Sequence, residues 1–156
     1  MGFFSDFFKK KKKSHIPEYD SGLIAKFHNE HKKLVDHIGE IQKVMDAGAI
    51  GTGKVKKLLK SFKMELLGHF MEEDIKLYWY LKNYYKEDEL SLSVVKEFED
   101  SIKKIQKDVM HFFDHYSLND VPLDKEFEAT FKEIVDALSS RIASEEENLY
   151  TLYLPE

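Results

Sequence analysis

Hydrophobic residues recur at intervals of three and four along four long segments of the chain, the spacing of an amphipathic α-helix. The segments cover residues 20–47, 53–85, 91–116 and 124–154. Pro17, Pro122 and Pro155 lie outside them, and three glycines cluster within residues 48–53, so the pattern breaks at residues that end helices. No alternating strand pattern competes. We therefore predict four helices joined by short connections.

Short connections between four long amphipathic helices favour an all-α, up-down-up-down antiparallel four-helix bundle. One face of each helix is apolar and is expected to point inward. His31 interrupts this face in the first helix, His69 and Glu73 interrupt it in the second, and Glu145 interrupts it in the fourth. The third helix has an apolar face apart from a terminal tyrosine. The bundle interior is therefore expected to contain a small set of polar residues.

Counting along the helices places these polar residues at one depth. His31 lies about fifteen residues before the first connection and His69 about sixteen after it, so antiparallel packing brings the two level. The same count adds three residues to the layer: Glu73, Arg141 and Glu145. His111 and His115 fall about 15 Å away along the axis. We exclude these two from the layer and expect them, together with Asp108, on a solvated helix face.

The second and fourth helices repeat one another at an offset of 72 residues. Leu66, His69, Glu73, Leu77 and Tyr78 correspond to Leu138, Arg141, Glu145, Leu149 and Tyr150. The first and third helices match at an offset of 71, which aligns His31 with Ile102. The chain is thus built from two related helical hairpins. Only the first hairpin keeps histidines in the polar layer.

The inward His31, the His-x-x-x-Glu of residues 69–73 and the Glu-Glu-x-x-Leu-Tyr of residues 145–150 resemble the hemerythrin-like (HHE cation-binding) family. The resemblance covers about residues 21–154. It implies two irons between the helices, held by histidines and bridged by two carboxylates, in proteins that bind dioxygen or sense oxygen, redox state or iron. Carried over, His31 and His69 are terminal ligands, and Glu73 and Glu145 are bridging carboxylates. These donors suit iron first, and also manganese or zinc.

Two departures from the family pattern leave two interpretations open. Ile102 and Arg141 stand where the second hairpin of the family has histidines. In one interpretation a single ion occupies the surviving half-site, with the Arg141 guanidinium in place of the second cation. In the other no metal binds, and Arg141 pairs with both buried carboxylates while the histidines are hydrogen-bonded core residues. His28, one turn before His31, is a further candidate for a supporting role near the metal.

Composition narrows the chemistry further. The chain has no cysteine, which excludes disulfides, thiolate metal sites and cysteine nucleophiles. Its net charge is −5, and because Lys9–Lys13 with Asp6 give the first thirteen residues +4, the remainder carries −9. An acidic body argues against nucleic-acid binding. No apolar stretch approaches the ~20 residues of a membrane-spanning helix, and we expect a cytoplasmic protein.

Residues 1–19 are expected to form a Phe/Lys-rich tail, and residues 20–154 the bundle. In the tail, two phenylalanine pairs at four-residue spacing precede Lys9–Lys13, as in an interfacial membrane anchor, although a solvated tail accounts for the pattern equally simply. Asp6 stands where a myristoylation signal has Ser or Thr. The aromatic residues within 78–85 are expected to lie in the core and at the end of the second helix. The charged residues within 54–60 and 145–147 are expected on outer helix faces, with Glu145 alone turned inward.

No nucleophile with an adjacent base and no phosphate-binding loop is visible, so catalysis is not predicted. The sequence instead favours a bacterial-type, cytoplasmic hemerythrin-like protein that binds non-haem iron and works in sensing or regulation. A small diatomic molecule at the metal and a protein are its expected partners, as a monomer or homodimer. The alternative is a metal-free four-helix regulatory module that binds a protein partner, with Arg141 replacing the metal charge.

Overall fold

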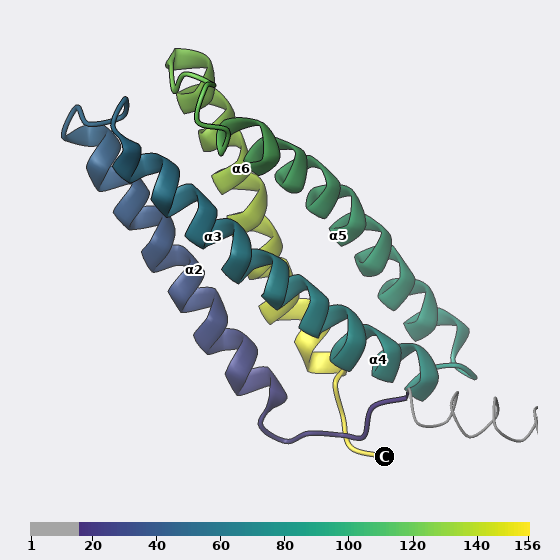
Figure 1. The fold of residues 1–156 in the computed structure, drawn as a ribbon. Coiled ribbons are helices and arrows are strands. Elements are labelled where there is room, and N and C mark those ends of the chain that lie inside the picture. Colours follow the sequence, from purple (N-terminus) through teal and green to yellow (C-terminus); the bar gives the residue numbers. More distant parts are fainter. Residues whose placement is uncertain (1–15) are drawn as a thin grey trace, which may run out of the picture.

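Four helical rods lie side by side in the computed structural model, which describes residues 16–156 (Figure 1). The first rod is α2 (Leu23–Asp46) and the third is α5 (Glu89–Tyr116). The second consists of α3 (Gly53–Glu72), the π-helix η1 (Glu73–Tyr78) and α4 (Trp79–Tyr84). The fourth consists of α6 (Lys125–Ser144), the π-helix η2 (Glu145–Leu149) and the 3₁₀-helix η3 (Tyr150–Leu152). Since the described part contains no strand, the all-α four-helix bundle is confirmed.

The helices run alternately up and down. The α2–α3 and α5–α6 connections lie at one end of the bundle, and the α4–α5 connection and the C-terminus lie at the other (Figure 1). The predicted division between residues 1–19 and 20–154 stays a prediction, and the proposed membrane contact of residues 1–13 lies outside the described residues. Within residues 16–156, no helix is both long and apolar enough to cross a membrane.

Side-chain caps explain where two helices begin. The Asp124 side chain accepts a hydrogen bond from the backbone N–H of Phe127 at 3.1 Å, so Asp124 is the N-cap of the fourth rod. The Asp88 carboxylate accepts from Ser91 N–H at 3.1 Å in the same way. Because Asp88 provides this cap, α5 begins at Glu89, two residues before the position predicted from periodicity alone.

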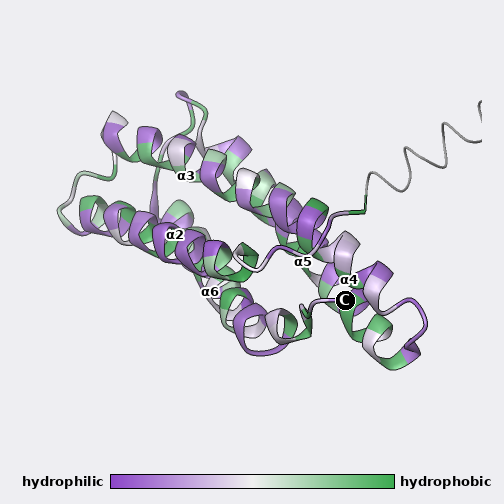
Figure 2. Ribbon diagram, turned by 90° about the horizontal axis from the view of Figure 1, so that it is seen from below, coloured by the Kyte–Doolittle hydropathy of each residue, from purple (hydrophilic) through white to green (hydrophobic). Residues whose placement is uncertain are grey.

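The apolar faces of the rods meet in the interior, as the hydropathy colouring shows along each helix (Figure 2). The core consists of aliphatic and aromatic side chains from all four rods. Ile102 is buried at the position where the repeat pattern would place a histidine. Few acidic, basic or imidazole side chains share this interior, and burying one without a partner is costly. They are His31, His69, Glu73, Glu99, Arg141 and Glu145.

Each of the two π-helical segments begins at a buried glutamate. Glu73 opens η1 and Glu145 opens η2, and these are equivalent positions of the internal repeat. In an α-helix, residues five apart point about 140° away from each other. The i→i+5 hydrogen bonding of a π-helix places such residues above one another instead. The segment after each glutamate therefore turns a residue toward the interior that α-helical periodicity would direct elsewhere.

Candidate metal centre

Four side chains converge midway along the bundle. His31 comes from α2, His69 from the last turn of α3, and Glu73 and Glu145 from the first residues of η1 and η2. Each contributes a ligand atom within 4.8 Å of the others, and no side chain of the set is more than 5% exposed. The structure thus assembles all four sequence-predicted ligands in one layer. Two imidazoles and two carboxylates form a donor set suited to a divalent or trivalent metal ion.

The two imidazoles face each other through the same ring nitrogen. His31 Nε2 lies 3.1 Å from His69 Nε2. Glu73 Oε1 is in short contact with His69 Nε2 and lies 3.9 Å from His31 Nε2. Three atoms that carry lone pairs therefore surround one point between α2, α3 and η1.

A second pair of carboxylates holds the outer edges of the two rings. Glu146 Oε2 lies 3.0 Å from His31 Nδ1, and Glu30 Oε1 lies 2.7 Å from His69 Nδ1. A carboxylate accepts a hydrogen bond, so each of these contacts assigns the ring proton to Nδ1. The two Nε2 atoms lie only 3.1 Å apart; in neutral rings both then carry lone pairs, and the His69 ring carries a second proton, on Nε2, where it donates to Glu73. This arrangement requires a cation or a proton between them and matches the carboxylate–histidine–metal pattern.

The two buried glutamates differ in protonation. Burial raises the pKa of Glu73, but hydrogen bonds from Glu145, His31 and His69 outweigh it and bring that pKa well below its usual value. Burial and the neighbouring Glu73 charge raise the pKa of Glu145 well above its usual value. In the metal-free layer a proton therefore binds more readily to Glu145 than to Glu73. Glu73 Oε2 is buried and accepts no hydrogen bond from any described residue, which leaves an oxygen available to a cation.

The charges around the histidines favour a cation as well. Burial lowers the pKa of His69, but its contacts with Glu73 and Glu30 outweigh this effect and raise the pKa overall. Burial raises the pKa of Glu146, but contacts with His31 and His28 outweigh it, and this pKa is lowered. The layer thus attracts positive charge, whether a proton or a metal ion supplies it.

Arg141 occupies the half of the layer that belongs to the second hairpin. One of its terminal nitrogens donates to the Tyr78 hydroxyl at 2.6 Å and to the Phe98 carbonyl at 2.7 Å. Its guanidinium carbon lies 4.8 Å from the centre of the Phe98 ring. Its Nε lies 3.4 Å from Glu145 Oε1, a charge contact without hydrogen-bond geometry.

This direction bears on the two interpretations left open by the sequence. A metal-free bundle held by Arg141 was expected to direct the guanidinium at both carboxylates. In the structure its hydrogen bonds go to Tyr78 and Phe98 instead, and Glu145 is its ion-pair partner among the described residues. Glu73 receives its polar contacts from the histidine side of the layer. The guanidinium therefore contacts one of the two buried carboxylates, Glu145, rather than both.

Tyr150 is a residue of this centre that the sequence reasoning missed. Its hydroxyl lies 3.2 Å from His31 Nε2, 3.2 Å from Glu145 Oε2 and 3.4 Å from Glu73 Oε1. Burial, followed by the charge of Glu73, raises the pKa of the phenol. The available signal was the repeat itself, which pairs Tyr150 with Tyr78. In each hairpin the tyrosine follows the glutamate by five residues, and two side chains at this spacing point to the same side only in a π-helix.

Glu30 and Glu146 were also missed as carboxylates that orient the histidines. Glu146 was predicted to lie on an outer face, and that prediction was wrong, because its carboxylate turns in to His31 Nδ1. Each glutamate is a direct chain neighbour of a predicted ligand, Glu30 of His31 and Glu146 of Glu145. Helical periodicity alone points such neighbours away from the seam. Their long side chains reach back around the helix, which periodicity does not describe.

The remaining predicted residues lie at the edge of the centre or away from it. His28 is 44% exposed and contacts Glu146 Oε2 at 3.0 Å, so it touches the carboxylate that orients His31. His111 and His115 line a surface groove between α5 and α6 and do not belong to the converging cluster. Their exclusion from the layer is consistent with the structure.

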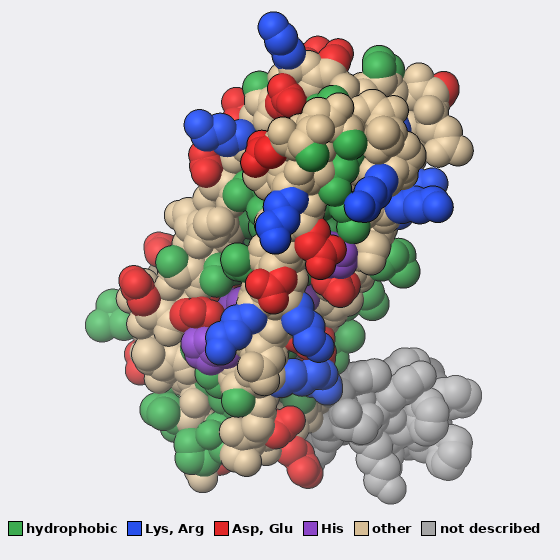
Figure 3. All heavy atoms as spheres, turned by 90° about the vertical axis from the view of Figure 1, so that its left-hand side faces the viewer, with side chains coloured by type: hydrophobic (Ala, Val, Ile, Leu, Met, Phe, Trp, Pro, Cys, Tyr) green, Lys and Arg blue, Asp and Glu red, His purple; other side chains and the backbone are tan. Residues whose placement is uncertain are grey.

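Shallow hollows on the surface approach the centre from two sides. One, of about 330 Å³ between α2 and α3, reaches Glu30 and His69, and another, of about 320 Å³, reaches His28, His31 and Glu146. Figure 3 views the molecule from the left-hand side of Figure 1. On this face, lysine, acidic and histidine side chains lie close together. Beside the two ligand histidines, a cavity of about 10 Å³ lined largely by apolar side chains has room for about one water-sized molecule.

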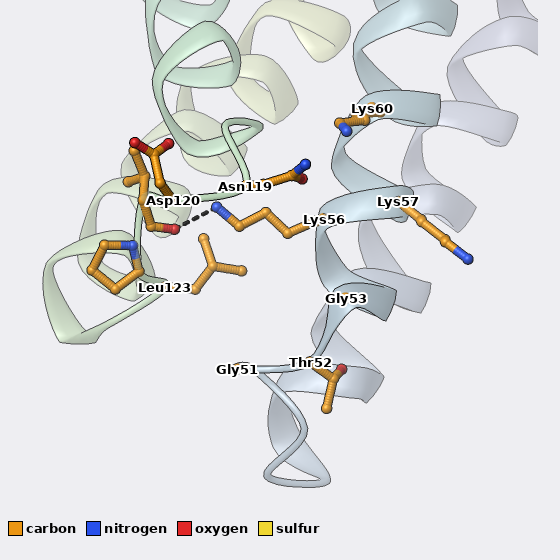
Figure 4. Close-up of a pocket in the computed structure, with 11 residues that line it drawn as sticks. Gly51, Thr52, Gly53, Lys56, Lys57, Lys60, Asn119, Asp120 and Leu123 are labelled. Atoms are coloured by element: carbon orange, nitrogen blue, oxygen red, sulfur yellow. Dashed lines mark hydrogen bonds between the residues drawn. The ribbon is translucent and has the colours of Figure 1, made fainter.

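A larger hollow, of about 600 Å³, lies at the end of the bundle near the α2–α3 and α5–α6 connections. Lys56 extends across it and donates to the Val121 carbonyl, whereas Lys57 points away (Figure 4). Lys56 also donates to the carbonyls of Tyr116, at 2.9 Å, and Leu118. These bonds satisfy carbonyls at the C-terminal end of α5 and beyond it, so the lysine has a structural role here.

Comparison with known protein families gives a match over most of the chain. The model of the Hemerythrin HHE cation binding domain matches residues 22–153, which include all four converging ligands and Arg141. None of the curated proteins and none of the solved structures compared with the chain matches it. The matched range agrees with the resemblance predicted over residues 21–154.

Proposed function

The chain belongs to the Hemerythrin HHE cation-binding domain family, and on that premise we propose that it binds a single non-haem iron ion. The ligands are His31, His69, Glu73 and Glu145. We further propose that this bacterial-type protein works in the cytoplasm, where it senses or regulates iron, oxygen or redox state. Its role is binding rather than catalysis.

One observation carries the proposal of a metal. Both Nδ1 atoms are held by carboxylates, Glu146 and Glu30, so in the neutral rings the lone pairs of the two Nε2 atoms face each other at 3.1 Å. A hydrogen-bonded core histidine pair would have a donor opposite an acceptor. Here the outer carboxylates instead orient both rings for one cation, with Glu73 completing the near side.

The position of Arg141 supports one ion rather than two. Its guanidinium lies in the second half of the layer and is fixed there by Tyr78 and Phe98. A permanent positive charge at this place repels a second metal ion and offers it no lone pair. Ile102, the other replaced position, cannot coordinate a metal either.

Iron suits these donors, because mixed imidazole and carboxylate sites hold iron, manganese and zinc. Iron bound here would supply one-electron chemistry and an open position for a small diatomic ligand. The chain's own residues perform the other tasks. The histidines and glutamates orient the ion, Glu30 and Glu146 fix the imidazole tautomer, and the surrounding aromatic and aliphatic side chains limit water.

A metal-free regulatory bundle is the second candidate function. The contact between Arg141 Nε and Glu145 Oε1, at 3.4 Å, favours it, because this cation offsets part of the buried negative charge without any metal. In that case the raised pKa of Glu145 favours a proton on that carboxyl group, which removes the second buried negative charge. The protein would then act through a protein partner alone.

The test is metal content of the untagged protein purified without chelators, for iron, manganese and zinc, and again after anaerobic iron loading. We expect about one equivalent of iron per chain in the wild type and its loss in H69A. His37 offers a matched control, since it also joins α2 to α3 through a glutamate, Glu65, at 2.7 Å but lies outside the cluster. H37A is expected to keep the iron.

Each other result has a definite meaning. About two equivalents would show that the second hairpin binds metal despite Arg141. No metal in either preparation would overturn the proposal and leave the regulatory bundle. Equal loss in H69A and H37A would mean that the variants unfold rather than lose a ligand, and circular dichroism of both decides that point.

A further inference from the structure

Tyr150 has its hydroxyl inside the cluster of metal ligands. We propose that Tyr150 Oη is a further ligand of the ion, bound as a phenolate when the iron is ferric. This inference rests on the proposed function, because it needs iron in the centre. Nothing in the family match assigns this tyrosine a role.

The distances around Oη are those of atoms that share one ion. A metal ion of this kind lies about 2.0–2.2 Å from its nitrogen and oxygen ligands, which places neighbouring ligand atoms roughly 3 to 3.5 Å apart. Tyr150 Oη lies 3.2 Å from His31 Nε2, 3.2 Å from Glu145 Oε2 and 3.4 Å from Glu73 Oε1. The two ligand nitrogens are separated by 3.1 Å. The hydroxyl therefore stands at the same spacing as the histidines and carboxylates.

The backbone directs Tyr150 to this position. Tyr150 follows Glu145 by five residues, and the π-helical turn of η2 places both on the inner side of the bundle. The His31 ring stacks against the Tyr150 ring with 5.8 Å between centroids and an angle of 13° between planes. The phenol is buried, and its hydrogen-bond partners are ligand atoms.

Charge favours this ligand for ferric rather than ferrous iron. Glu73 and Glu145 supply two negative charges, which balance Fe²⁺, and a phenolate adds the third that balances Fe³⁺. When the Fe–O bond forms, the O–H bond of Tyr150 breaks and its proton passes to solvent, so no oxidant or reductant is needed for the ligation itself. Tyrosinate is an established iron ligand in haem proteins, which shows that the pairing is chemically sound.

The equivalent tyrosine of the other hairpin has a different partner. Tyr78 ends η1 as Tyr150 follows η2, and its hydroxyl accepts a hydrogen bond from Arg141 at 2.6 Å. Each tyrosine thus caps one half of the polar layer. Tyr78 faces the fixed cation of the second half, and Tyr150 faces the metal position of the first. This pair supplies a control that matches in residue type, burial and place in the repeat.

The experiment is visible absorption and resonance Raman spectroscopy of the full-length protein, loaded anaerobically with Fe²⁺ and oxidised with ferricyanide. We expect a phenolate-to-iron charge-transfer band in the wild type, with tyrosinate ring modes enhanced on excitation within it. Y150F is expected to keep about one iron per chain and lose the band. Y78F is expected to keep both.

The outcomes separate this inference from the proposed function. Iron bound without a band in the wild type, or a band that survives in Y150F, overturns the ligand role of Tyr150 and leaves the metal centre standing. Absence of bound iron overturns both. If Y150F fails to fold by circular dichroism, the wild-type Raman spectrum and the Y78F control decide, and absent tyrosinate modes refute the ligation.

Discussion

The substitution Glu30→Gln tests whether the outer carboxylates tune the metal site. Glu30 Oε1 accepts from His69 Nδ1 at 2.7 Å, and the His69 side chain is only 4% exposed. Removing the Glu30 charge leaves the His69 ring in place. The ring is then oriented less firmly, and its Nε2 is less basic. Loss of such a partner typically lowers metal affinity 10–100-fold, or about 1.4–2.7 kcal/mol.

The structure places the expected effect near the lower end of this range. The Glu30 side chain is 23% exposed and has Lys26 at 3.9 Å, so solvent and a neighbouring cation screen part of its charge. We therefore expect E30Q to bind Fe²⁺ about tenfold more weakly than the wild type. The measurement is anaerobic competition for Fe²⁺ against a chromogenic chelator, at one ionic strength and pH.

Glu65→Gln is the matched control for this measurement. Glu65 binds His37 Nδ1 at the same 2.7 Å and bridges the same two helices, but His37 is not in the cluster. E65Q is expected to bind Fe²⁺ as tightly as the wild type. Affinity unchanged in E30Q, or lowered equally in both variants, would refute the idea that Glu30 acts through the His69 imidazole.

Three further predictions concern the stability of the metal-free bundle. Asp124→Ala removes the cap on Phe127 N–H and is expected to lower the free energy of unfolding by about 1 kcal/mol in urea titrations. Hydrogen bonds from Ser91 lower the pKa of Asp88, so the ionised Asp88 stabilises the fold above its unfolded-state pKa near 3.8, and this stabilisation is lost as pH falls through the lower pKa of the folded state. Asp88→Asn keeps a cap without the ionisation. We therefore expect the unfolding midpoint of this variant to fall less steeply with decreasing pH in that range. Lys56→Met removes three hydrogen bonds to carbonyls around the end of α5, and we expect it to lower the free energy of unfolding by roughly 1–2 kcal/mol, measured as a lower melting temperature. An unchanged melting temperature would mean that water replaces the lysine as the hydrogen-bond donor to these carbonyls.

The sequence was sufficient for the architecture because a four-helix bundle is specified by local periodicity and short connections. The inward positions of His31, His69, Glu73 and Glu145 follow from the same periodicity as their apolar neighbours, and counting along antiparallel helices brings them level. Arg141 was also assigned to the layer correctly. Ligation by these residues stays a prediction, because convergence of donors does not by itself measure metal occupancy.

The features that sequence reasoning missed depend on departures from ideal α-helical geometry and on side-chain reach. The π-helical turns at Glu73 and Glu145 depart from the 3.6-residue period on which the sequence predictions rest. Without them, Tyr150 is predicted to point away from Glu145. Glu146 was assigned to the surface because its Cα lies there, although its carboxylate reaches His31.

The charge of the Arg141 guanidinium also bears on whether the bundle needs metal in order to fold. Half of the polar layer holds a charge that belongs to the chain itself, and in the other half the raised pKa of Glu145 favours a bound proton over a second negative charge. The core is otherwise apolar and drawn from all four rods. Small domains that need a metal to fold are unfolded when it is scarce. Under the proposed function, this bundle can instead fold without metal. The fraction of the protein that holds a metal ion, rather than the amount of folded protein, then follows the supply of metal.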